Sequence, residues 1–382
     1  MNTSTPNATP IALKEQPITV DVLAEKYLKA GETSAHDLYQ RVAKALASAE
    51  APELRAHWEE KFLANLHAGA IGAGRIMSAA GTNIQATLIN CFVQPVGDGI
   101  QGFDDDGYPG IYEALREAAE TMRRGGGVGY DFSRIRPKGA EVKGTASIAS
   151  GPCSYINVFD QSCSTVESAG ARRGAQMGVL RIDHPDVLEF ITAKRTPGRW
   201  NNFNVSVGVS DAFMQAVADG SDWELVHKAM PGPKVMDKGA YQRADGLWVY
   251  RKLPARELWD TIMQSTYDFA EPGILFLDQI GRDNNLNYCE KIEATNPCGE
   301  QPLPPYGCCD LGPIILTNFV RNPFGAGGDA AFDFDAFEQV VATQVRALDN
   351  VLDVTFWPLE QQRNESADKR RIGVGFTGLG NA

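Results

Sequence analysis

The sequence predicts an α/β protein with a parallel sheet or barrel, preceded by a small helical region. Three observations lead to this prediction: helical patterns over residues 20–64, short apolar runs that alternate with helical stretches from about residue 86 onward, and a length of 382 residues. The alternation favours parallel strands, because a helix is the usual crossover between them. The length is sufficient for one large barrel domain.

Composition and charge exclude several classes of protein. Hydrophobic residues make up 43% of the chain and charged residues 22%, which is ordinary for a globular protein and unlike a disordered, collagenous or bilayer-spanning chain. The 36 basic and 48 acidic residues give a formal net charge of 36 − 48 = −12. Phosphate groups repel an acidic surface, so nucleic acids and membranes are not expected as partners.

The N-terminal tail and the cysteines indicate a cytoplasmic protein. Residues 1–19 are rich in Thr, Asn and Pro, lack the apolar core of a secretory signal, and are predicted to be a disordered tail. Seven cysteines are too few for a secreted disulfide scaffold of this length, so buried, metal-binding or redox-active thiols are expected. None is spaced as Cys-x-x-Cys, which gives little support to a zinc site.

Helix signals are strongest near the N-terminus. Ser34 and Asp37 resemble a capping box at the start of a helix within residues 20–64. Residues 111–124 predict another helix, with basic residues at its C-terminal end, where the helix dipole favours positive charge. Residues 253–270 also predict a helix.

The strands are predicted as short apolar runs between helices. Asp183 and Asp211 are expected to cap the helices that follow two of these strands, because a carboxylate at this position accepts a hydrogen bond from a free helix N–H. Residues 231–253 are expected to be a surface excursion. The predicted strands are residues 86–96, 178–182, 204–210 and 273–277.

The densest candidate for chemistry is the run Thr-Asn-Pro-Cys-Gly-Glu-Gln at residues 295–301. Its proline disfavours a helix, and its glycine lets a ligand approach the backbone. If the run is extended, Asn296, Cys298 and Glu300 lie at alternate positions and point the same way. An amide, a sulfur and a carboxylate could then hold a diol, abstract from it and take its proton. On chemistry alone, a proline-rich connector with incidental polar residues is an equal alternative.

Two other motifs resemble known sites but are not expected to be functional. Residues 373–378 match the Gly-x-Gly-x-x-Gly dinucleotide fingerprint, yet no strong strand precedes them and no acidic residue lies about 20 positions on. His184 lies between Asp183 and Asp186, but helix capping explains the two carboxylates and no second histidine is expected nearby. We therefore expect no metal site.

Several motifs, taken together and in order, resemble the catalytic subunit of ribonucleotide reductases. The Asn-Pro-Cys-Gly-Glu of residues 296–300, followed closely by the Cys-x-Leu-Gly of residues 309–312, resembles the finger loop of that family. The Pro-Cys-Gly form resembles the class II, adenosylcobalamin-dependent branch. The resemblance spans roughly residues 65–382. The further motifs that occur in the family's order are at residues 90–93, 124–133, 144–152, 172–178, 183–186, 203–207 and 271–274.

The resemblance implies reduction of ribonucleotides to 2′-deoxyribonucleotides by a thiyl-radical mechanism. Cys298 resembles the cysteine that becomes the radical and removes the 3′ hydrogen. Glu300 resembles the base for the 3′ hydroxyl, and Asn296 the amide that orients the sugar hydroxyls. Cys91 resembles the thiol that protonates the departing 2′ hydroxyl and is then oxidised to a disulfide with Cys309.

The resemblance also implies loops that contact substrate and effector. Residues 144–152 resemble the loop that holds a deoxynucleoside triphosphate effector, and residues 170–177 the loop that links it to the substrate base. Two arginines flanked by glycines suit an anion-contacting segment, and a solvated basic turn is the alternative. Residues 101–109 look like an insertion where the family places effector contacts. The candidate loop residues are Asn90, Gly126, Gly127, Ser150, Gly151, Arg172, Arg173, Gln176 and Asn204.

The family fold is a ten-stranded α/β barrel of two five-stranded halves, with the finger loop between them. The resemblance therefore implies a disordered tail (1–19), a helical N-terminal region (20–64) and a partial barrel (65–382). Within the partial barrel, the finger is expected at residues 291–318. The chain is thus expected to be the N-terminal portion of a class II reductase that needs its C-terminal half.

The cofactor implied is adenosylcobalamin, and the resemblance assigns no residue that binds it. The implied partners are a ribonucleotide substrate, a deoxynucleoside triphosphate effector, a thioredoxin-type dithiol reductant, the C-terminal half of the enzyme and, as one option, a second copy of the chain. Two alternatives stay open. One is the large subunit of a class I reductase, which takes its radical from a separate metal-containing subunit, and the other is a catalytically inactive nucleotide-binding fragment.

Overall fold

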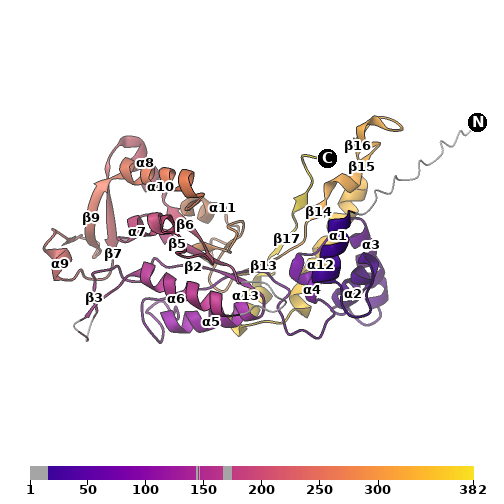
Figure 1. The fold of residues 1–382 in the computed structure, drawn as a ribbon, viewed down its shortest axis with the longest axis horizontal. Helices are drawn as coiled ribbons and strands as arrows, with labels where there is room; N and C mark the ends of the chain where they lie inside the picture. Colours follow the sequence, from indigo (N-terminus) through magenta and orange to yellow (C-terminus); the bar gives the residue numbers. More distant parts are fainter. Residues whose placement is uncertain (1–15, 143–144, 146, 167–173) are drawn as a thin grey trace, which may run out of the picture. The chain divides into compact units, whose positions relative to one another are not determined.

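The computed structural model describes residues 16–142, 145, 147–166 and 174–382 (Figure 1). It divides into two compact units, and each is described by itself. The first unit comprises residues 1–90, 309–356 and 369–382, and the second comprises residues 91–308 and 357–368. None of the helices in the described part of the chain is long and apolar enough to cross a bilayer.

The first unit is mainly helical. Its helices are α1 (Pro17–Val22), a π-helical turn (Leu23–Tyr27), α2 (Ala35–Ala47), α3 (Arg55–His67), α4 (Gly74–Ala79) and α12 (Phe334–Val354). The predicted capping box is confirmed: the Ser34 hydroxyl accepts a hydrogen bond from the Asp37 N–H, and the Asp37 carboxylate accepts one from the Ser34 N–H. Helix α12 packs against α2 and α3. Arg346 on α12 forms a bidentate ion pair with the buried Glu50, with both bonds at 2.7 Å.

Short strands complete the first unit. They are β13 (Cys308–Leu311, from its second residue onward), β14 (Ile314–Ile315), β15 (Val320–Arg321), β16 (Ala331–Phe332), β17 (Ile372–Gly373) and β18 (Phe376–Thr377). Strand β13 pairs in parallel with β17, and β14 pairs in parallel with β18, whereas β15 and β16 form an antiparallel pair. A small core of Ala70, Ile314 and Phe319 packs beside them, and the ring of Phe337 meets that of Phe319 edge to face.

The second unit contains the predicted parallel sheet. Its strands are β1 (Cys91–Val93), β2 (Gly127–Asp131), β5 (Gln176–Arg181), β6 (Phe203–Val209) and β10 (Gly273–Phe276). They lie in the order β10-β6-β5-β2-β1, and every neighbouring pair is parallel. Each strand therefore pairs with the one before it in this series, and helices form the crossovers. The predicted α/β class is confirmed.

The helices of the second unit surround these strands in Figure 1. They are α5 (Ile111–Arg123), α6 (Pro152–Thr165), α7 (Val187–Thr192), α8 (Asp211–Asp219), α9 (Pro233–Met236), α10 (Ala255–Phe269), α11 (Leu277–Asp283) and α13 (Glu360–Lys369, up to residue 368). An aromatic cluster fills the space between sheet and helices. Tyr130 and Phe132 from β2 and its end each meet Phe159 of α6 edge to face, and all three rings are fully buried.

Several local predictions are wrong, and hydrogen bonds explain why. The strand predicted over residues 86–96 shrinks to Cys91–Val93, because the Leu88 N–H donates to the Thr355 hydroxyl rather than to a neighbouring strand. Asp183 does not cap α7, since its carboxylate is bound by the Arg181 guanidinium.

The cap and the excursion predicted around the third strand also differ. Helix α8 begins at Asp211, and the cap is Ser210, whose hydroxyl accepts from the Phe213 N–H. The segment expected to be a surface excursion contributes two strands to an antiparallel sheet in the order β7-β9-β8. These strands are β7 (Asp222–His227), β8 (Tyr241–Gln242) and β9 (Trp248–Pro254).

Candidate active site

The Asn-Pro-Cys-Gly-Glu motif forms the tip of a β-hairpin in the second unit. Strand β11 (Ala294–Thr295) pairs antiparallel with β12 (Pro302–Leu303). At the tip the Gly299 N–H donates to the Asn296 carbonyl at 3.0 Å, which closes a turn with proline at its second position. Gly299 has a φ of +85°, a region that favours glycine. The run is therefore a turn and not the extended segment that the alternate-position argument assumed.

The turn brings two of the predicted residues onto the thiol of Cys91. The Asn296 side-chain Nδ2 donates to the Cys91 sulfur at 3.1 Å, and the Cys91 thiol donates to Glu300 Oε1 at 3.6 Å. Cys91 is the first residue of β1 and is 5% exposed. A thiol, an amide donor and a carboxylate acceptor therefore meet at the N-terminal end of the sheet.

The orientation of the Asn296 amide is fixed by its surroundings. Its side chain is completely buried. Its Oδ1 accepts from the Gln301 N–H at 2.9 Å, while its own N–H donates to the Gln301 carbonyl at 3.1 Å. Because Oδ1 already faces a backbone donor, Nδ2 is the atom that faces Cys91. The amide is thus held as a hydrogen-bond donor toward sulfur.

The hairpin is seated against the sheet at two points. A Cβ atom on Gly129 of β2 would stand 1.7 Å from the Thr295 carbonyl oxygen, so the hairpin backbone occupies the space that a side chain would need. On β6, the Asn204 Nδ2 donates to the Pro297 carbonyl at 2.7 Å. Asn204, a predicted loop residue, is therefore brought to the finger.

The two other predicted cysteines lie in different surroundings. Cys298 is exposed at the hairpin tip. Cys309 belongs to the first unit, where it is buried on β13 and its thiol donates to the Asp310 carbonyl at 3.4 Å. The disulfide of Cys91 with Cys309 stays a prediction.

The glycine-loop candidates mostly have packing roles. A Cβ on Gly126 would meet the Phe92 ring at 2.6 Å, and Gly127 opens β2. Gly151 precedes α6 with a φ of +84°, and a Cβ there would stand 2.3 Å from Asp186 Oδ2. These glycines let the backbone approach neighbouring groups closely.

The polar loop candidates are dispersed. Gln176 opens β5 instead of lying in a loop, and its amide is bonded inside the core to the Tyr130 hydroxyl at 3.0 Å and the Phe159 carbonyl at 3.2 Å. Ser150 is exposed, and Asn90 Oδ1 is buried with no hydrogen-bond partner among the described residues. Arg172 and Arg173 lie outside the described residues, as does Gly144 of the predicted effector loop.

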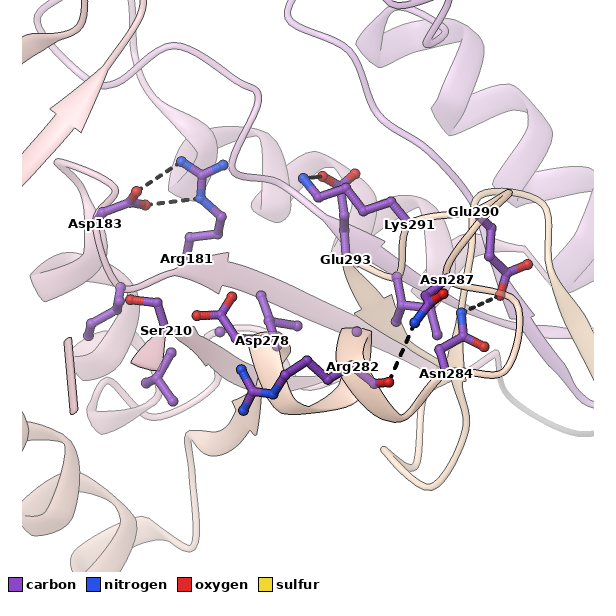
Figure 2. A pocket seen from close by; sticks show the side chains of 16 residues that line it. Arg181, Asp183, Ser210, Asp278, Arg282, Asn284, Asn287, Glu290, Lys291 and Glu293 are labelled. Atoms are coloured by element: carbon purple, nitrogen blue, oxygen red, sulfur yellow. Dashed lines mark hydrogen bonds and ion pairs between the residues drawn. The ribbon is translucent and has the colours of Figure 1, made fainter. Parts of the chain in front are cut away.

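A cavity of about 630 Å³ lies at the other end of the same sheet (Figure 2). Its walls include Arg181 at the end of β5, Val209 at the end of β6 and Leu277 directly after β10. Parallel strands end at one edge, so this cavity and the Cys91 cluster lie at opposite ends of the strands. Sequence reasoning missed it, although charged residues directly after three predicted strands were a usable signal. The charged and amide side chains around it are Arg181, Asp183, Asp278, Arg282, Asn284, Asn287, Glu290, Lys291 and Glu293.

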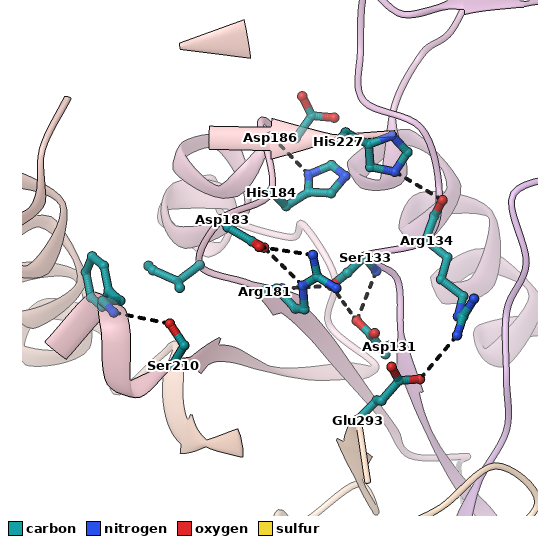
Figure 3. A network of polar contacts seen from close by, with 12 residues as sticks. Asp131, Ser133, Arg134, Arg181, Asp183, His184, Asp186, Ser210, His227 and Glu293 are labelled. Carbon is teal, nitrogen blue, oxygen red and sulfur yellow. Dashed lines mark hydrogen bonds and ion pairs between the residues drawn. The ribbon is translucent and has the colours of Figure 1, made fainter. Parts of the chain in front are cut away.

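A buried polar network adjoins this cavity (Figure 3). Burial raises the pKa of Asp131 to about 6, and the nearby Glu293 carboxylate contributes in the same direction. Asp131 accepts from both the hydroxyl and the N–H of Ser133, and the Ser133 hydroxyl in turn accepts from the Arg181 N–H at 2.8 Å.

His184 has a second histidine beside it, contrary to the sequence-based expectation. The rings of His184 and His227 lie edge to face with centroids 5.5 Å apart. In each ring Nδ1 accepts from a backbone N–H, and Nε2 faces a backbone carbonyl. Both rings are therefore neutral and protonated on Nε2. Burial lowers the pKa of His184 to about 3 and that of His227 to about 4. Among the described residues no group of three or more His, Cys, Asp or Glu side chains could hold a metal ion.

Comparison with known protein families decides the affiliation. Residues 14–85 match the ribonucleotide reductase all-alpha domain, and residues 89–382 match the ribonucleotide reductase barrel domain. The chain belongs to the ribonucleotide reductase family. This confirms the predicted family and the predicted combination of a helical region with an α/β barrel fold.

Individual reductases resemble the chain over most of its length. It is 36% identical over 379 residues to a vitamin B12-dependent ribonucleoside-diphosphate reductase of Mycobacterium tuberculosis (strain CDC 1551 / Oshkosh), which covers 96% of this chain and 50% of that protein. It is 38% identical over 301 residues to a vitamin B12-dependent ribonucleoside-diphosphate reductase of Thermoplasma acidophilum, and the match covers 78% of this chain and 35% of that protein. The large subunit of the Monkeypox virus ribonucleoside-diphosphate reductase is 26% identical to it over 293 residues, and the match covers 73% of this chain and 37% of that protein. The chain spans half the length of the Mycobacterium relative.

Proposed function

We propose that this chain is the part of a ribonucleotide reductase that carries the radical cysteine and both reducing thiols. The observation that carries the proposal is the convergence of Asn296 and Glu300 on the Cys91 thiol, at the tip of a hairpin that exposes Cys298. A thiyl radical that abstracts hydrogen, a carboxylate base and a proton-donating thiol are the groups that removal of a sugar hydroxyl requires.

Each residue has a proposed task in the reaction. The Cys298 thiyl removes the 3′ hydrogen atom of the ribose and returns a hydrogen atom there at the end of the cycle. Glu300 takes the proton of the 3′ hydroxyl, and Asn296 hydrogen-bonds the sugar hydroxyls. Cys91 protonates the 2′ hydroxyl, which leaves as water. Cys91 and Cys309 then form a disulfide, and the two electrons released reduce the C2′ carbon.

The contacts around Cys91 support its role as proton donor. Its thiol points at the Glu300 carboxylate, and its sulfur receives an N–H from Asn296. A donor toward sulfur stabilises the thiolate that remains after the proton leaves. The same two residues would therefore assist both the sugar and the thiol. Cys309 is proposed as the second thiol on sequence resemblance.

The proposed cofactor is adenosylcobalamin. The Cys298 side chain is exposed, so its sulfur can be reached by a radical-generating group bound next to the tip. When bound, this cofactor supplies the homolytic chemistry that oxidises a thiol by one electron. Among the described residues, the chain's own contribution is to hold the tip turn through the Gly299–Asn296 and Gln301–Asn296 hydrogen bonds.

The proposal extends to partners and domains. The substrate is a ribonucleotide, the effector a deoxynucleoside triphosphate held near residues 144–152, and the reductant a thioredoxin-type dithiol in the cytoplasm. Residues 20–64 form the helical region and residues 65–382 the partial barrel with its finger at 291–318. Activity requires a C-terminal half, with a homodimer as one possible assembly.

The test is to fuse the chain to the C-terminal portion of the Mycobacterium tuberculosis relative that lies beyond the matched region. The fusion, with adenosylcobalamin, a dithiol and a ribonucleotide, is expected to form deoxyribonucleotide. Cys298→Ser should abolish the product, whereas the matched control Cys289→Ser, which changes the other exposed cysteine, should not. Product that persists in Cys298→Ser contradicts the radical assignment.

Two outcomes would favour the alternatives. A folded fusion that binds nucleotide but forms no product supports the inactive nucleotide-binding fragment. Product that forms without cobalamin, once a separate radical-generating subunit is added, supports the class I large subunit.

A further inference from the structure

Glu293 connects three segments of the second unit at the base of the finger hairpin. It directly precedes β11 and is 9% exposed. Its carboxylate accepts from the Tyr108 hydroxyl at 3.1 Å and from the Lys291 ammonium at 2.7 Å, and it lies 3.8 Å from the Arg134 guanidinium. Figure 3 shows the Arg134 and Glu293 side chains reaching toward one another. Although burial opposes the charge, these partners lower the pKa of Glu293, so it is an anion.

Tyr108 and Arg134 are themselves tied together. The Arg134 guanidinium lies over the Tyr108 ring, 3.8 Å from its centroid, and pairs with Asp106 and Asp104 of the same acidic loop. The loop is closed internally, because the Tyr108 N–H donates to the Asp104 carboxylate at 2.8 Å. Tyr108 is therefore presented to Glu293 by a braced loop, and burial raises its pKa to about 12, which keeps its hydroxyl protonated as a donor.

The route from Glu293 to the chemistry is short. Two residues on, the Thr295 carbonyl packs against Gly129 with no space for a side chain. Three residues on, Asn296 holds the Cys91 sulfur. A rigid chain segment of this length transmits a shift at its base to its tip, and a displacement near 1 Å at reacting groups can lower a rate by about 100-fold.

We propose that Glu293 is a positioning residue and that the acidic loop, through Tyr108 and Arg134, fixes the register of the finger hairpin on the sheet. This inference rests on the proposed function for its catalytic consequence, but the positioning itself is a property of the second unit. The loop at residues 97–110 thus has a role that its sequence does not indicate. It contacts the base of the hairpin at the end of the strands opposite to the Cys91 cluster.

A matched triad elsewhere in the unit supplies the control. On the antiparallel sheet, Glu224 accepts from the Tyr241 hydroxyl at 2.6 Å and from Arg243 at 3.2 Å. This triad has the same three residue types as Tyr108, Glu293 and Arg134 but no link to the finger. Tyr241→Phe and Glu224→Gln therefore measure the general effect of losing such contacts.

The first readout is hydrogen exchange in the full chain, followed by mass spectrometry. Tyr108→Phe and Glu293→Gln should speed exchange in peptides covering residues 294–303 by about 3- to 10-fold, with peptides of β5 and β6 unchanged, because local opening reports local stability. The double variant should exchange little faster than Glu293→Gln alone, since both act through one carboxylate. Hairpin exchange no faster than in the Tyr241 and Glu224 variants overturns the proposal, and Tyr108→Phe keeps the test valid if Glu293→Gln fails to fold.

The second readout is turnover in the fusion protein described above. Displacing the finger should lower kcat by about tenfold and raise KM for the ribonucleotide much less, because the finger carries Cys298 and Glu300, which react with the sugar, and Asn296 is its one proposed sugar-binding group. A parallel rise in KM, or equal losses in the Glu224 control, contradicts positioning. If the wild-type fusion is inactive, the proposed function fails, while the exchange measurement still decides the role of Glu293.

Discussion

The Thr295 carbonyl oxygen occupies the place of a side chain on Gly129, 1.7 Å from where the Cβ would be. The base of the β11–β12 hairpin thus lies directly on the β2 backbone. Gly129→Ala should either push the hairpin away or strain β2, and we expect a loss of about 1–3 kcal/mol in the free energy of unfolding. Urea denaturation measures the stability, and deoxyribonucleotide formation by the fusion should fall with it.

Gly281→Ala is the control for this substitution. Gly281 lies in α11, and a Cβ there would meet nothing within 4 Å. Alanine is favoured over glycine in a helix, so this variant should be neutral or more stable by up to about 1 kcal/mol. If Gly129→Ala unfolds at the same urea concentration as Gly281→Ala, the packing of the hairpin does not depend on the absence of a side chain at residue 129.

Cysteine reactivity should separate the finger thiol from the core thiols. Cys298 and Cys289 are exposed, whereas Cys153 and Cys163 are buried. Burial raises the pKa of the Cys163 thiol to about 11 and raises that of Cys153 further. Because the thiolate is the reactive form, Cys298 and Cys289 should be alkylated at least about tenfold faster in the native chain at pH 7.5.

Peptide mass spectrometry after timed iodoacetamide treatment gives the alkylation rates. Cys289→Ser should leave one fast site, at Cys298. Equal rates at Cys163 and Cys298 in the folded chain would contradict the exposure of the hairpin tip.

The buried histidine His184 should make stability depend on pH. Its pKa is lowered from 6.5 to about 3 in the folded chain, so below pH 6.5 the unfolded state binds a proton that the folded state does not. The contribution of the neutral His184 to the free energy of unfolding is therefore complete above pH 6.5 and is lost as the pH falls toward 3. His184→Asn should lose about 1–3 kcal/mol at pH 7, where two buried hydrogen bonds are broken, and the difference from wild type should shrink by pH 4.5.

Asp131 should make the free energy of unfolding depend on pH in the opposite direction. Its folded pKa of about 6 exceeds the ordinary 3.8, so the folded state binds the extra proton and the contribution is lost as pH rises through 6. The stability of Asp131→Asn relative to wild type should therefore be higher at pH 7 than at pH 4.5. Urea midpoints at the two pH values measure both variants, and a pH-independent difference for either one would contradict its buried titration.

Sequence patterns were sufficient for four of the five parallel strands of the second unit, but not for β2, for the antiparallel strands β8 and β9, or for exact element ends. Alternation of apolar runs with helices predicted those four strands, and the capping box at Ser34 formed as expected. The strand before Cys91 is shorter than its apolar run because Thr355, some 267 residues away, takes the Leu88 N–H. A tertiary hydrogen bond of this kind leaves no local trace in the sequence.

The candidate site was predictable in its members rather than in its geometry. The motif made Asn296, Cys298 and Glu300 candidates and placed them on one side only if the run were extended, whereas the run forms a turn. The meeting of Asn296 with Cys91 spans 205 residues and was implied only by family resemblance. His227 lies beside His184 where the Val226 N–H of β7 donates to the Asp183 carbonyl at 2.6 Å, and no spacing in the sequence indicates this contact.

Converting Asn296 to aspartate tests the buried donor directly. The side chain is fully buried, with Oδ1 accepting from Gln301 and Nδ2 donating to Cys91. Asn296→Asp keeps the shape and the Oδ1 contact but replaces the donor with an acceptor that faces sulfur. Burial should raise the pKa of the new carboxyl above its ordinary 3.9, so it folds protonated at low pH and must ionise or unfold as pH rises.

The expected result is a stability loss that grows with pH. Each unit by which the pKa is raised corresponds to about 1.4 kcal/mol, so Asn296→Asp should be at least about 1–3 kcal/mol less stable relative to wild type at pH 8 than at pH 5. Asn287→Asp, at an exposed position, is the matched control and should show little difference between the two pH values. A loss at Asn296 that does not change with pH would show that water reaches the amide, and the assignment of a dry Asn296–Cys91 contact would then be wrong.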